Sequence, residues 1–418
     1  MTDHILVFGA GYDIPARIRA AGKAAGRETV TTIMCWPSHL PKMDDTEEHA
    51  RVVVVSPSAS NEEWITLVCA IHAVQPVTRI GSFYDDCRPQ AAVAAQVLGL
   101  PMHSPEVVEL VSNKHLMRRR LAEKGLEHTP SEVVGSAEEV RRFAKGRGYP
   151  CVVKPLAGEA SKGVSILRRA SEATSAYRRA AGTGADGRVI VEEYFGGPQF
   201  SVESFSERRE HVVVAVTRKY SDSASLVELG HVIPAPLEPE QSEAISAHVI
   251  GALDALEVEY GPTHTEIILT SLGPRVIETH LRTGGDEIWN LVTGATGIDL
   301  IEYQLRQVLG GDVLADLRAT LASRDSAPRC EAIWYAGSPD AGTLVEIEGV
   351  DAALPPGVTV EVLRKPGAQL AGLQESDSRL AQARSHAATA EEAVSLARSA
   401  IEGLTFVTRV APAHSDLI

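Results

Sequence analysis

Several signatures of whole protein classes are missing from this sequence of 418 residues. Its five cysteines, at positions 35, 69, 87, 151 and 330, are odd in number and form no CxxC pair. This pattern argues against a disulfide framework and a zinc site, and it favours reduced thiols in a cytoplasmic protein. No run approaches the ~18 apolar residues of a membrane span, and no charged segment with a long apolar stretch precedes the first strand. We therefore expect neither a membrane anchor nor a signal peptide.

An excess of positive charge is also lacking. Fifty-five acidic residues against 40 Lys and Arg leave a net charge of −15, which argues against a general nucleic-acid binder but allows an anionic ligand in a local basic pocket. There is no repeat and no low-complexity segment. The hydrophobic content of 44% and the charged content of 23% are typical of a globular protein. The length calls for about two or three domains.

The first part of the chain alternates between apolar strands and helical segments. Strands are expected at 4–9, 30–36, 51–56 and within 78–86, and helices after residue 11, over 61–73 and over 89–98. This alternation predicts a parallel, doubly wound, Rossmann-like domain over residues 1–103. The turn at Gly9 and Gly11 suggests dinucleotide binding, but Pro15 stands where a third glycine is needed. An NAD-linked oxidoreductase is therefore only a weak alternative.

The middle of the chain follows a different pattern. A helix over 112–125 and a capping box at Ser136 and Glu139 are followed by several β-rich runs. Across residues 112–310 these runs do not alternate strictly with helices, which favours antiparallel sheets. The last ~90 residues carry short strands and one helix over about 389–403, and they are predicted to form a smaller α+β appendage.

The most informative segment is a predicted hairpin that carries two glutamates. Two β-rich runs, 262–270 and 274–286, flank Ser271-Leu272-Gly273. If these three residues form the loop, Thr270 faces Pro274 and Glu266 faces Glu278, roughly 4.5–5.5 Å apart, where like charges are destabilising. A Mg²⁺ ion between the carboxylates would explain the pair. The alternative is a solvated acidic face.

Strand alternation places three more polar residues, His264, His280 and Arg282, on the face of the two glutamates. Arg282 could therefore form a bidentate contact with a carboxylate or phosphate oxygen next to the metal.

Three earlier segments suit a nucleoside triphosphate. Lys154 ends a buried strand, and the loop 158–163 supplies small residues, backbone amides, a hydroxyl and a cation that can cover phosphates. The strand 188–195 then breaks into Gly196-Gly197-Pro198, which exposes backbone groups able to read an adenine edge. None of these is a Walker A loop. Each alone is equally compatible with an ordinary strand end or flexible turn.

In this order, and followed by the acidic hairpin, the segments resemble the ATP-grasp superfamily over about residues 104–310. The resemblance implies that two lysines and a small-residue loop hold the ATP phosphates and that the linker after a strand reads the adenine. The residues so implied are Lys114, Lys154, Gly158, Ser161, Lys162, Gly163, Glu192, Glu193, Phe195 and, at the ribose position where a glutamate is usual, Gln199. Glu266 and Glu278 are implied as ligands of two Mg²⁺ or Mn²⁺ ions.

The superfamily ending Glu-x-Asn-x-Arg reads Glu278-Thr279-His280-Leu281-Arg282 in this chain, with histidine in place of asparagine. Because imidazole suits Mg²⁺ less well than oxygen does, His280 could be a metal ligand, a hydrogen-bond partner of substrate or phosphate, or a structural residue. Within the superfamily the chain is most similar to L-amino acid ligases and related carboxylate–amine ligases. The patterns that carry this likeness are 230–235 and 282–286, and they imply contacts to substrate or second metal for His231 and Gly285.

The implied fold combines α/β and α+β parts. Its expected units are a Rossmann-like domain (1–103), a small ATP-grasp subdomain with the phosphate lid (104–187), a large subdomain with the metal site (188–325) and a C-terminal α+β subdomain (326–418). The implied reaction joins an amino acid carboxylate to an amine, such as a second amino acid in a dipeptide, through an acyl phosphate. Arg282 is the expected catalytic residue.

Other outcomes remain open. The chain could be a purine-pathway, carboxylase-like or acid-kinase-like ATP-grasp enzyme, or a non-catalytic nucleotide-binding module. Retention of both glutamates and both lysines speaks against the last of these. No carrier domain or biotinylation motif is evident. The expected partners are small molecules, with no nucleic acid and no membrane, and a homodimer is left open.

Overall fold

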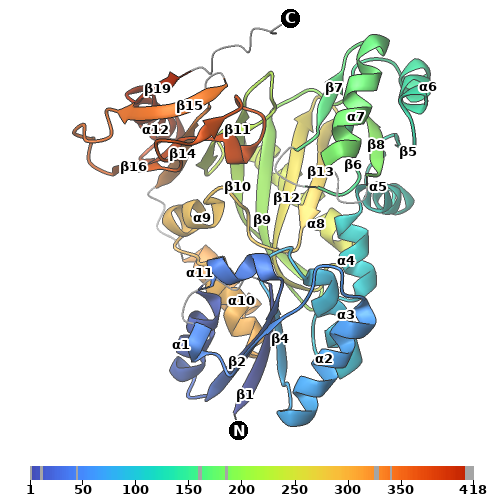
Figure 1. The fold of residues 1–418 in the computed structure, drawn as a ribbon, viewed down its shortest axis with the longest axis vertical. Helices are drawn as coiled ribbons and strands as arrows, with labels where there is room; N and C mark the ends of the chain where they lie inside the picture. The colour runs from blue at the N-terminus through green and yellow to red at the C-terminus, as the bar shows by residue number, and fades with distance from the viewer. Residues whose placement is uncertain are drawn as a thin grey trace, which may run out of the picture.

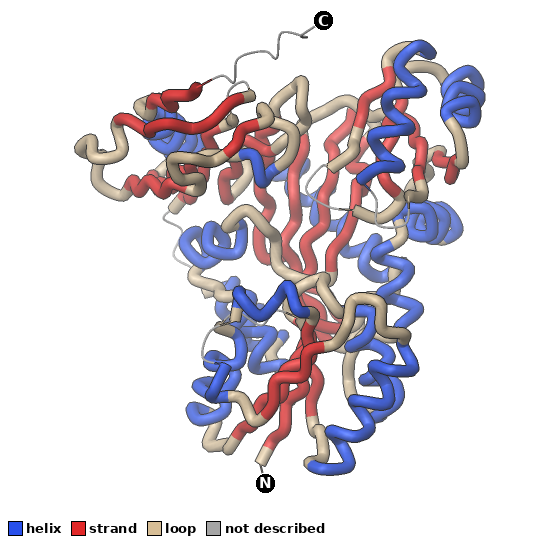
Figure 2. Tube along the Cα trace, in the orientation of Figure 1, coloured by secondary structure: helices blue, strands red, loops and turns tan. Residues whose placement is uncertain are grey.

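The computed structural model describes residues 2–9, 13–43, 46–158, 162–183, 187–323, 329–338 and 341–409. Figure 1 shows an N-terminal layer at the bottom, a broad sheet in the middle, a small unit at the upper right and a C-terminal unit at the upper left. Helices flank the strands throughout (Figure 2). None of the described helices has the combination of length and apolar character needed to cross a membrane.

The N-terminal layer is a parallel sheet, as predicted, and its strand order is β3-β2-β1-β4. Its elements are β1 (Asp3–Phe8), α1 (Ile14–Ala24), β2 (Thr29–Cys35), η1 (Pro37–Lys42), η2 (Thr46–Glu48), β3 (Arg51–Val54), α2 (Asn61–Val74), β4 (Arg79–Ser82) and α3 (Arg88–Leu98). Every residue of β1 is buried, because helices cover both faces of this sheet.

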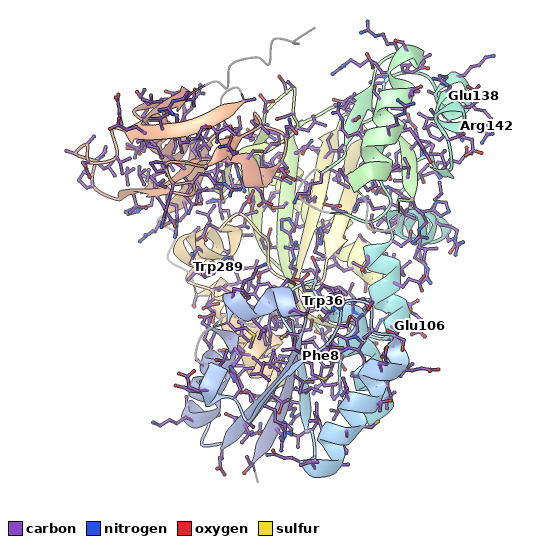
Figure 3. All side chains as sticks on the ribbon, viewed as in Figure 1. Phe8, Trp36, Glu106, Glu138, Arg142 and Trp289 are labelled. Atoms are coloured by element: carbon purple, nitrogen blue, oxygen red, sulfur yellow. The ribbon has the colours of Figure 1, made fainter. Side chains whose placement is uncertain are left out.

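Alternate residues of β1 face two different cores. Leu6 and Phe8 pack with Trp64 beneath α2 and α3, and the Phe8 and Trp64 rings stack at 5.9 Å. Ile5 and Val7 pack with α1 and with Leu305 from a helix 300 residues further along the chain. Figure 3 shows Phe8 inside this layer, whereas Glu138 and Arg142 lie on the outer surface of the small unit. The N-terminal layer is thus sealed by a late segment of the chain.

The small unit consists of an antiparallel sheet in the order β5-β8-β6-β7 with two helices on one side. Two connecting helices, α4 (Pro105–Ser112) and α5 (Lys114–Glu123), lead into it. Helix α4 was not predicted from the sequence. The elements of the unit are β5 (Ser131–Val134), α6 (Ala137–Arg147), β6 (Cys151–Pro155), β7 (Ser165–Leu167), η3 (Ala170–Glu172), α7 (Ala173–Thr183) and β8 (Val189–Glu193).

The central sheet has eight strands, paired in the order β13-β12-β9-β10-β11-β14-β18-β16. Its pairs are antiparallel, as expected for 112–310. The first part contains β9 (Gln199–Glu207), β10 (Glu210–Ser221), β11 (Glu228–Ile233), α8 (Pro239–Ala255), β12 (Tyr260–Thr270), β13 (Gly273–His280), α9 (Ile288–Thr296), α10 (Leu300–Val308) and α11 (Leu314–Ala322).

The two faces of this sheet differ in chemistry. On β9, Phe200 and Val202 point into an apolar core beneath α8, whereas Ser201 and Glu203 point to the opposite face. That opposite face carries buried polar groups on β12 as well, including His264, which pairs in register with Glu203. The sheet therefore packs one face on an apolar core, and on the opposite face it keeps polar groups beside a second apolar core that contains Phe205.

The two glutamates of the acidic hairpin face each other as predicted, but the turn between the strands is shorter than predicted. Glu266 faces Glu278, while Thr270 faces Gly273 rather than Pro274. The turn is therefore two residues long, Ser271-Leu272, and the predicted three-residue loop was wrong. A β-bulge between Glu266 and Ile267 adds one residue on β13 and restores the predicted register.

The C-terminal part continues the central sheet through β14 (Cys330–Ala336), β18 (Ala381–Ala387) and β16 (Val358–Val362). β14 pairs directly with β11 of the preceding unit. A separate three-stranded sheet contains β17 (Gln369–Leu370), β15 (Gly342–Glu348) and β19 (Thr405–Arg409), and α12 (Ala390–Glu402) packs beside it, with the short helix η4 at Ser376–Ser378. The C-terminal part is thus α+β. Three of its strands, β14, β18 and β16, belong to the central sheet, whereas β17, β15 and β19 form a sheet of their own.

Candidate active site

Two neighbouring cavities open on the polar side of the acidic hairpin. The first lies between the small unit and strands β12 and β13. Its described lining residues are Lys114, Arg118, Thr129, Val152, Lys154, Pro155, Gly158, Lys162, Val164, Ile166, Glu192, Glu193, Tyr194, Phe195, Gln199, Leu226, Glu228, Glu266, Ile268, Arg275, Val276, Ile277 and Glu278. This lining combines cations with aliphatic and aromatic side chains, which suits a ligand that has both an anionic part and a flat apolar part.

Lys154 at the end of β6 is buried in an ion-pair network. Its Nζ lies 2.7 Å from Oε2 of Glu192, whose Oε1 accepts a hydrogen bond from Arg118 Nε at 3.1 Å. Burial raises the pKa of Glu192, but Arg118 and Lys154 outweigh it and bring that pKa to about 2. Burial lowers the pKa of Lys154. A cation is thereby held in place on the cavity wall with little of its side chain exposed.

Lys114 joins the small unit to the acidic hairpin. This first residue of α5 places Nζ 2.7 Å from Oε2 of Glu278 and donates to the carbonyl oxygen of Gly158 at 3.0 Å. Asn113 caps the helix, since its side chain accepts from the backbone of His115 and Leu116. The lysine therefore lies between the phosphate-loop segment and one of the two facing glutamates.

The predicted phosphate loop is described only at its ends. Ser161 falls outside the described residues, as do positions 159 and 160. Lys162 lines the first cavity and pairs with Glu375 and Asp377 of the C-terminal part at 3.2 Å each. Gly163 does not line the cavity; it adopts a left-handed φ of 75°, where a Cβ would lie 2.0 Å from the Thr183 hydroxyl.

The end of β8 forms the apolar side of the first cavity. The Arg275 guanidinium lies over the Phe195 ring, with its carbon 5.9 Å from the ring centroid. Tyr194 and Gln199 line the same cavity. Gln199 is also held by its backbone, since its carbonyl accepts from Arg218 at 2.8 Å.

The second cavity shares Glu228, Glu266 and Glu278 with the first. Its other described lining residues are Lys219, His231, His264, His280, Arg282, Gly285, Asp286, Ile288, Ser376, Asp377 and Arg379. The predicted glutamates therefore stand on the boundary between two spaces, one next to the lysines and one next to Arg282.

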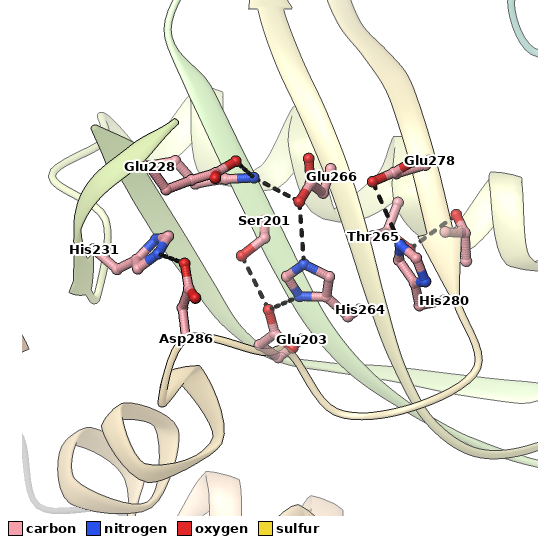
Figure 4. Close-up of polar contacts among 12 residues, drawn as sticks. Ser201, Glu203, Glu228, His231, His264, Thr265, Glu266, Glu278, His280 and Asp286 are labelled. Carbon is pink, nitrogen blue, oxygen red and sulfur yellow. Dashed lines mark hydrogen bonds and ion pairs between the residues drawn. The ribbon is translucent and has the colours of Figure 1, made fainter. Parts of the chain in front are cut away.

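A row of alternating charges supports Glu266 (Figure 4). Lys219 Nζ lies 2.5 Å from Glu266 and 3.2 Å from Glu228, and His264 bridges Glu203 at 2.7 Å to Glu266 at 3.5 Å. Burial raises the pKa of Glu266, yet Lys219 and His264 lower it to about 2. Burial lowers the pKa of His264, but Glu203 outweighs burial and raises that pKa to about 9. The carboxylate of Glu266 is therefore charged at neutral pH.

His280 and Arg282 meet a carboxylate from the N-terminal layer. Asp85 Oδ2 lies 3.0 Å from Nδ1 of His280 and 2.7 Å from Nε of Arg282. The other ring nitrogen of His280 lies 3.4 Å from Glu278. Burial opposes the charged form, but Asp85 and Glu278 raise the pKa of His280. In this arrangement both ring nitrogens have carboxylate partners, so the imidazole acts as a bridge between carboxylates.

Comparisons with known proteins agree with this geometry. Residues 147–289 match the ATP-grasp domain family, and residues 335–409 match the L-amino acid ligase C-terminal domain 2. Residues 147–289 are therefore identified as an ATP-grasp domain. The predicted α/β and α+β fold and the predicted family, an ATP-grasp ligase, are confirmed.

Individual relatives of this ATP-grasp protein are more distant. The uncharacterized protein y4rH of Sinorhizobium fredii is 30% identical over 282 residues, which is 64% of this chain and 55% of that protein, so the match spans about half of its length. The formate-dependent phosphoribosylglycinamide formyltransferase of Paraburkholderia xenovorans is 28% identical over 66% of this chain and 67% of its own. The L-amino acid ligase of Bacillus licheniformis has the same fold, with a TM-score of 0.80, 22% identity and coverage of 97% and 99%.

ATP-grasp enzymes generally use ATP with Mg²⁺, and the donor set of the acidic hairpin fits such an ion. Two charged, half-buried carboxylates face each other across β12 and β13 at the junction of the two cavities. Among the described residues no three His, Cys, Asp or Glu side chains are arranged so that they could hold a metal ion together, so phosphate or water would supply the further ligands. Mg²⁺ is usually bound in this way, by one or two carboxylates and phosphate oxygens.

Several residues of this ATP-grasp site were missed from sequence. Lys219, Arg118, Asp85 and Arg379 all take part in the ion-pair networks of the two cavities. Arg118 could have been found, because it stands four residues after Lys114 on the same helical face. Asp85 follows the carboxyl end of β4, the edge where parallel sheets place ligands. Lys219 and Arg379 carry no comparable sequence signal.

Proposed function

We propose that this protein is an ATP-dependent carboxylate–amine ligase that joins an amino acid to an amine, such as a second amino acid, through an acyl phosphate. The observation that carries the proposal is the position of Glu266 and Glu278, which line both cavities at once. ATP in the first cavity would present its γ-phosphate at these glutamates, next to a substrate in the second cavity.

The proposed reaction has two steps, and in each of them a nucleophile displaces a leaving group. A substrate carboxylate oxygen attacks the γ-phosphorus, the bond to the β-phosphate oxygen breaks, and ADP leaves. The amine then attacks the acyl carbon, loses a proton and expels inorganic phosphate. A pair of Mg²⁺ ions at Glu266 and Glu278 would neutralise charge on the transferring phosphoryl group.

Residues of the chain have distinct tasks in this proposal. Lys114 and Lys154 hold the phosphates as buried point charges, and Phe195 and Glu193 receive the adenine. Arg282 can clamp a carboxylate with its planar guanidinium, while Asp85 orients it from the N-terminal layer. The pairing of Lys114 with Glu278 shields two charges until nucleotide and metal arrive.

In this mechanism water has to be kept from the acyl phosphate, which otherwise hydrolyses. The match of residues 335–409 to a domain of L-amino acid ligases favours amino acids as substrates. A purine-pathway substrate is the second candidate, because a phosphoribosylglycinamide formyltransferase is 28% identical to the chain.

The test is a screen of ADP and phosphate release over pairs of amino acids, with glycinamide ribonucleotide plus formate as the alternative pair. The acid substrate is labelled with ¹⁸O in its carboxyl group. We expect one labelled oxygen in inorganic phosphate and an amide product by mass spectrometry. Release of AMP and pyrophosphate, or retention of both labelled oxygens in the organic products, would exclude the acyl-phosphate route.

A further inference from the structure

The wall of the second cavity is almost entirely polar. Of its described lining residues, only Ile288 has an apolar side chain and Gly285 has none. The first cavity, in contrast, includes Val152, Ile166, Ile268 and other aliphatic groups. An apolar ring or chain would therefore find apolar surface in the first cavity and polar groups in the second.

One corner of this wall is built by the C-terminal part. Arg379, only 8% exposed, donates from Nη1 and Nη2 to the two carboxylate oxygens of Asp286 at 2.8 and 2.5 Å. Its guanidinium also stacks on Tyr335, 3.8 Å from the ring centroid. Asp286 is held at a left-handed φ of 52° between β13 and α9. The fork-like contact fixes both charges at the cavity surface.

A histidine extends this corner. His231 Nε2 lies 3.1 Å from Oδ2 of Asp286, and its ring is 1% exposed. Its Nδ1 is buried and has no hydrogen-bond partner in the described part of the chain. Lys219, Arg282 and His264, which also line this wall, each stand beside a carboxylate as well. Once metal ions neutralise Glu266 and Glu278, the remaining wall carries paired charges of both signs.

An apolar side chain in this space would remove water from these groups and return no hydrogen bond, which costs free energy for each group left unsatisfied. A polar side chain would replace that water with direct contacts. Sites built for hydrogen bonding reject analogues that lack the polar group more strongly than apolar pockets reject extra polar groups.

We infer that the amino acid occupying the second cavity has a polar, hydrogen-bonding side chain, and that Asp286, Arg379 and His231 determine this specificity. The inference rests on the proposed function, since it names the substrate class of the same site. It also assigns to the C-terminal part a direct role in substrate choice, through Arg379.

The experiment compares nearly isosteric amino acids, asparagine against leucine and glutamine against methionine. Binding is measured by isothermal titration to the full chain with Mg²⁺ and a non-hydrolysable ATP analogue, and ADP release is measured in parallel. We expect the polar member of at least one pair to bind at least ~10-fold more tightly. Tighter binding of leucine and methionine, or no binding of any of the four, would overturn the inference.

A double variant tests the assigned residues. Asp286→Leu with Arg379→Met removes both charges together, and replacing a buried ion pair by apolar residues is often neutral for stability, whereas removing one partner is not. The ratio of affinities should move toward leucine or methionine by at least ~10-fold. The matched control, Arg318→Met with Glu210→Leu, removes an exposed ion pair on α11 and β10 and should leave the ratio unchanged.

The two proposals fail in different ways. Selective binding of asparagine or glutamine without any ADP release would overturn the ligase function and support the polar site. ADP release with leucine or methionine as the better substrate would support the ligase and overturn the polar site. Should the double variant not fold, the wild-type ratio alone decides the substrate class, and Arg379→Lys, which keeps the charge but loses the fork, should reduce the polar preference.

Discussion

At the scale of single residues, the proposed chemistry depends on charge at the acidic hairpin. Glu278→Gln removes one negative charge where Mg²⁺ would meet the phosphates, and it leaves the backbone pairing with Glu266 intact. We expect kcat to fall by roughly 10²-fold or more, in line with the loss of a major electrostatic contact. Steady-state ADP release measures the effect.

The control for this variant is Glu138→Gln on α6, whose side chain is 81% exposed. It changes the net charge equally and should leave kcat within twofold of wild type. A near-normal rate for Glu278→Gln at saturating Mg²⁺, with the fold verified by circular dichroism, would refute the metal role of this residue.

The buried Glu192 predicts a dependence of stability on pH. Its pKa of about 2 lies below the ordinary value of 4.5, so its pairing with Arg118 and Lys154 stabilises the fold above pH 4.5 and is lost as pH falls toward 2. The shift corresponds to about 3 kcal/mol as an upper bound. Urea unfolding should show wild type losing this stabilisation as the pH falls from 4.5 to about 2.

Glu192→Gln should be less stable than wild type at pH 6 and should lose less of its unfolding free energy over the same pH window. Parallel pH profiles for variant and wild type would mean that this ion pair contributes nothing to acid sensitivity.

Site residues could be predicted from the sequence where they lie close together in it, as on the two strands of the acidic hairpin. The facing of Glu266 and Glu278 followed from counting along two strands, and it held because a bulge compensated for the shorter turn. The pairing of Asp85 with Arg282 and that of Arg379 with Asp286 could not be inferred in this way, since the partners lie far apart in sequence. Pairwise contacts of this kind depend on how the units pack, which local periodicity does not contain.

At the scale of elements, β11 carries both Glu228 and His231 and has a tight contact with its neighbour. A Cβ on Gly230 would lie 2.3 Å from the Trp334 ring and 2.9 Å from the carbonyl oxygen of Ile333 on β14. Trp334 cannot withdraw freely, because Tyr220 packs against it at 5.4 Å. Gly230→Ala should therefore cost ~1–3 kcal/mol and disturb the polar residues on either side.

Thermal unfolding and ADP release test this prediction together. Gly182→Ala in α7 is the matched control, because no atom lies within 4 Å of a Cβ built there, and it should be neutral or slightly stabilising. Equal melting temperatures for the two variants would show that β11 and β14 can move apart at little cost.

The strand β18 was not predicted from the sequence, because its residues favour helix. The segment of β18, AQARSHA, is rich in helix-forming residues, yet it is a strand between β14 and β16. Its alanines at 381 and 383 are fully buried in the C-terminal core, where small side chains allow close packing. Tertiary packing overrides propensity here, whereas strands with β-branched runs such as β1 and β6 were recognisable.

At the scale of the whole molecule, α10 ties the N-terminal layer to the body. Leu305 of α10 is fully buried among Ile5, Val7 and Ile18. Leu305→Ala should cost ~2–5 kcal/mol through lost burial and a cavity. Because the helix belongs to one unit and its core to another, the loss should appear in a single unfolding transition seen by both fluorescence and circular dichroism.

Leu272→Ala at the hairpin tip is the control, since Leu272 is 83% exposed and its truncation should change stability by less than ~0.5 kcal/mol. Separate transitions in wild type, with only the first affected by Leu305→Ala, would show that the N-terminal layer unfolds on its own.

The pairing of β11 with β14 has a consequence for how such proteins can be recombined. Chimeras are usually joined at predicted unit boundaries, here between residues 325 and 326, yet the hydrogen-bonded ladder continues from β11 into the C-terminal part. A transplanted C-terminal part must therefore reproduce the register of Gly230 with Trp334 and of His231 with Ile333. A mismatch of one residue would turn every side chain of β14 to the wrong face, so a graft that does not keep this register would have to bring its own β11 with it.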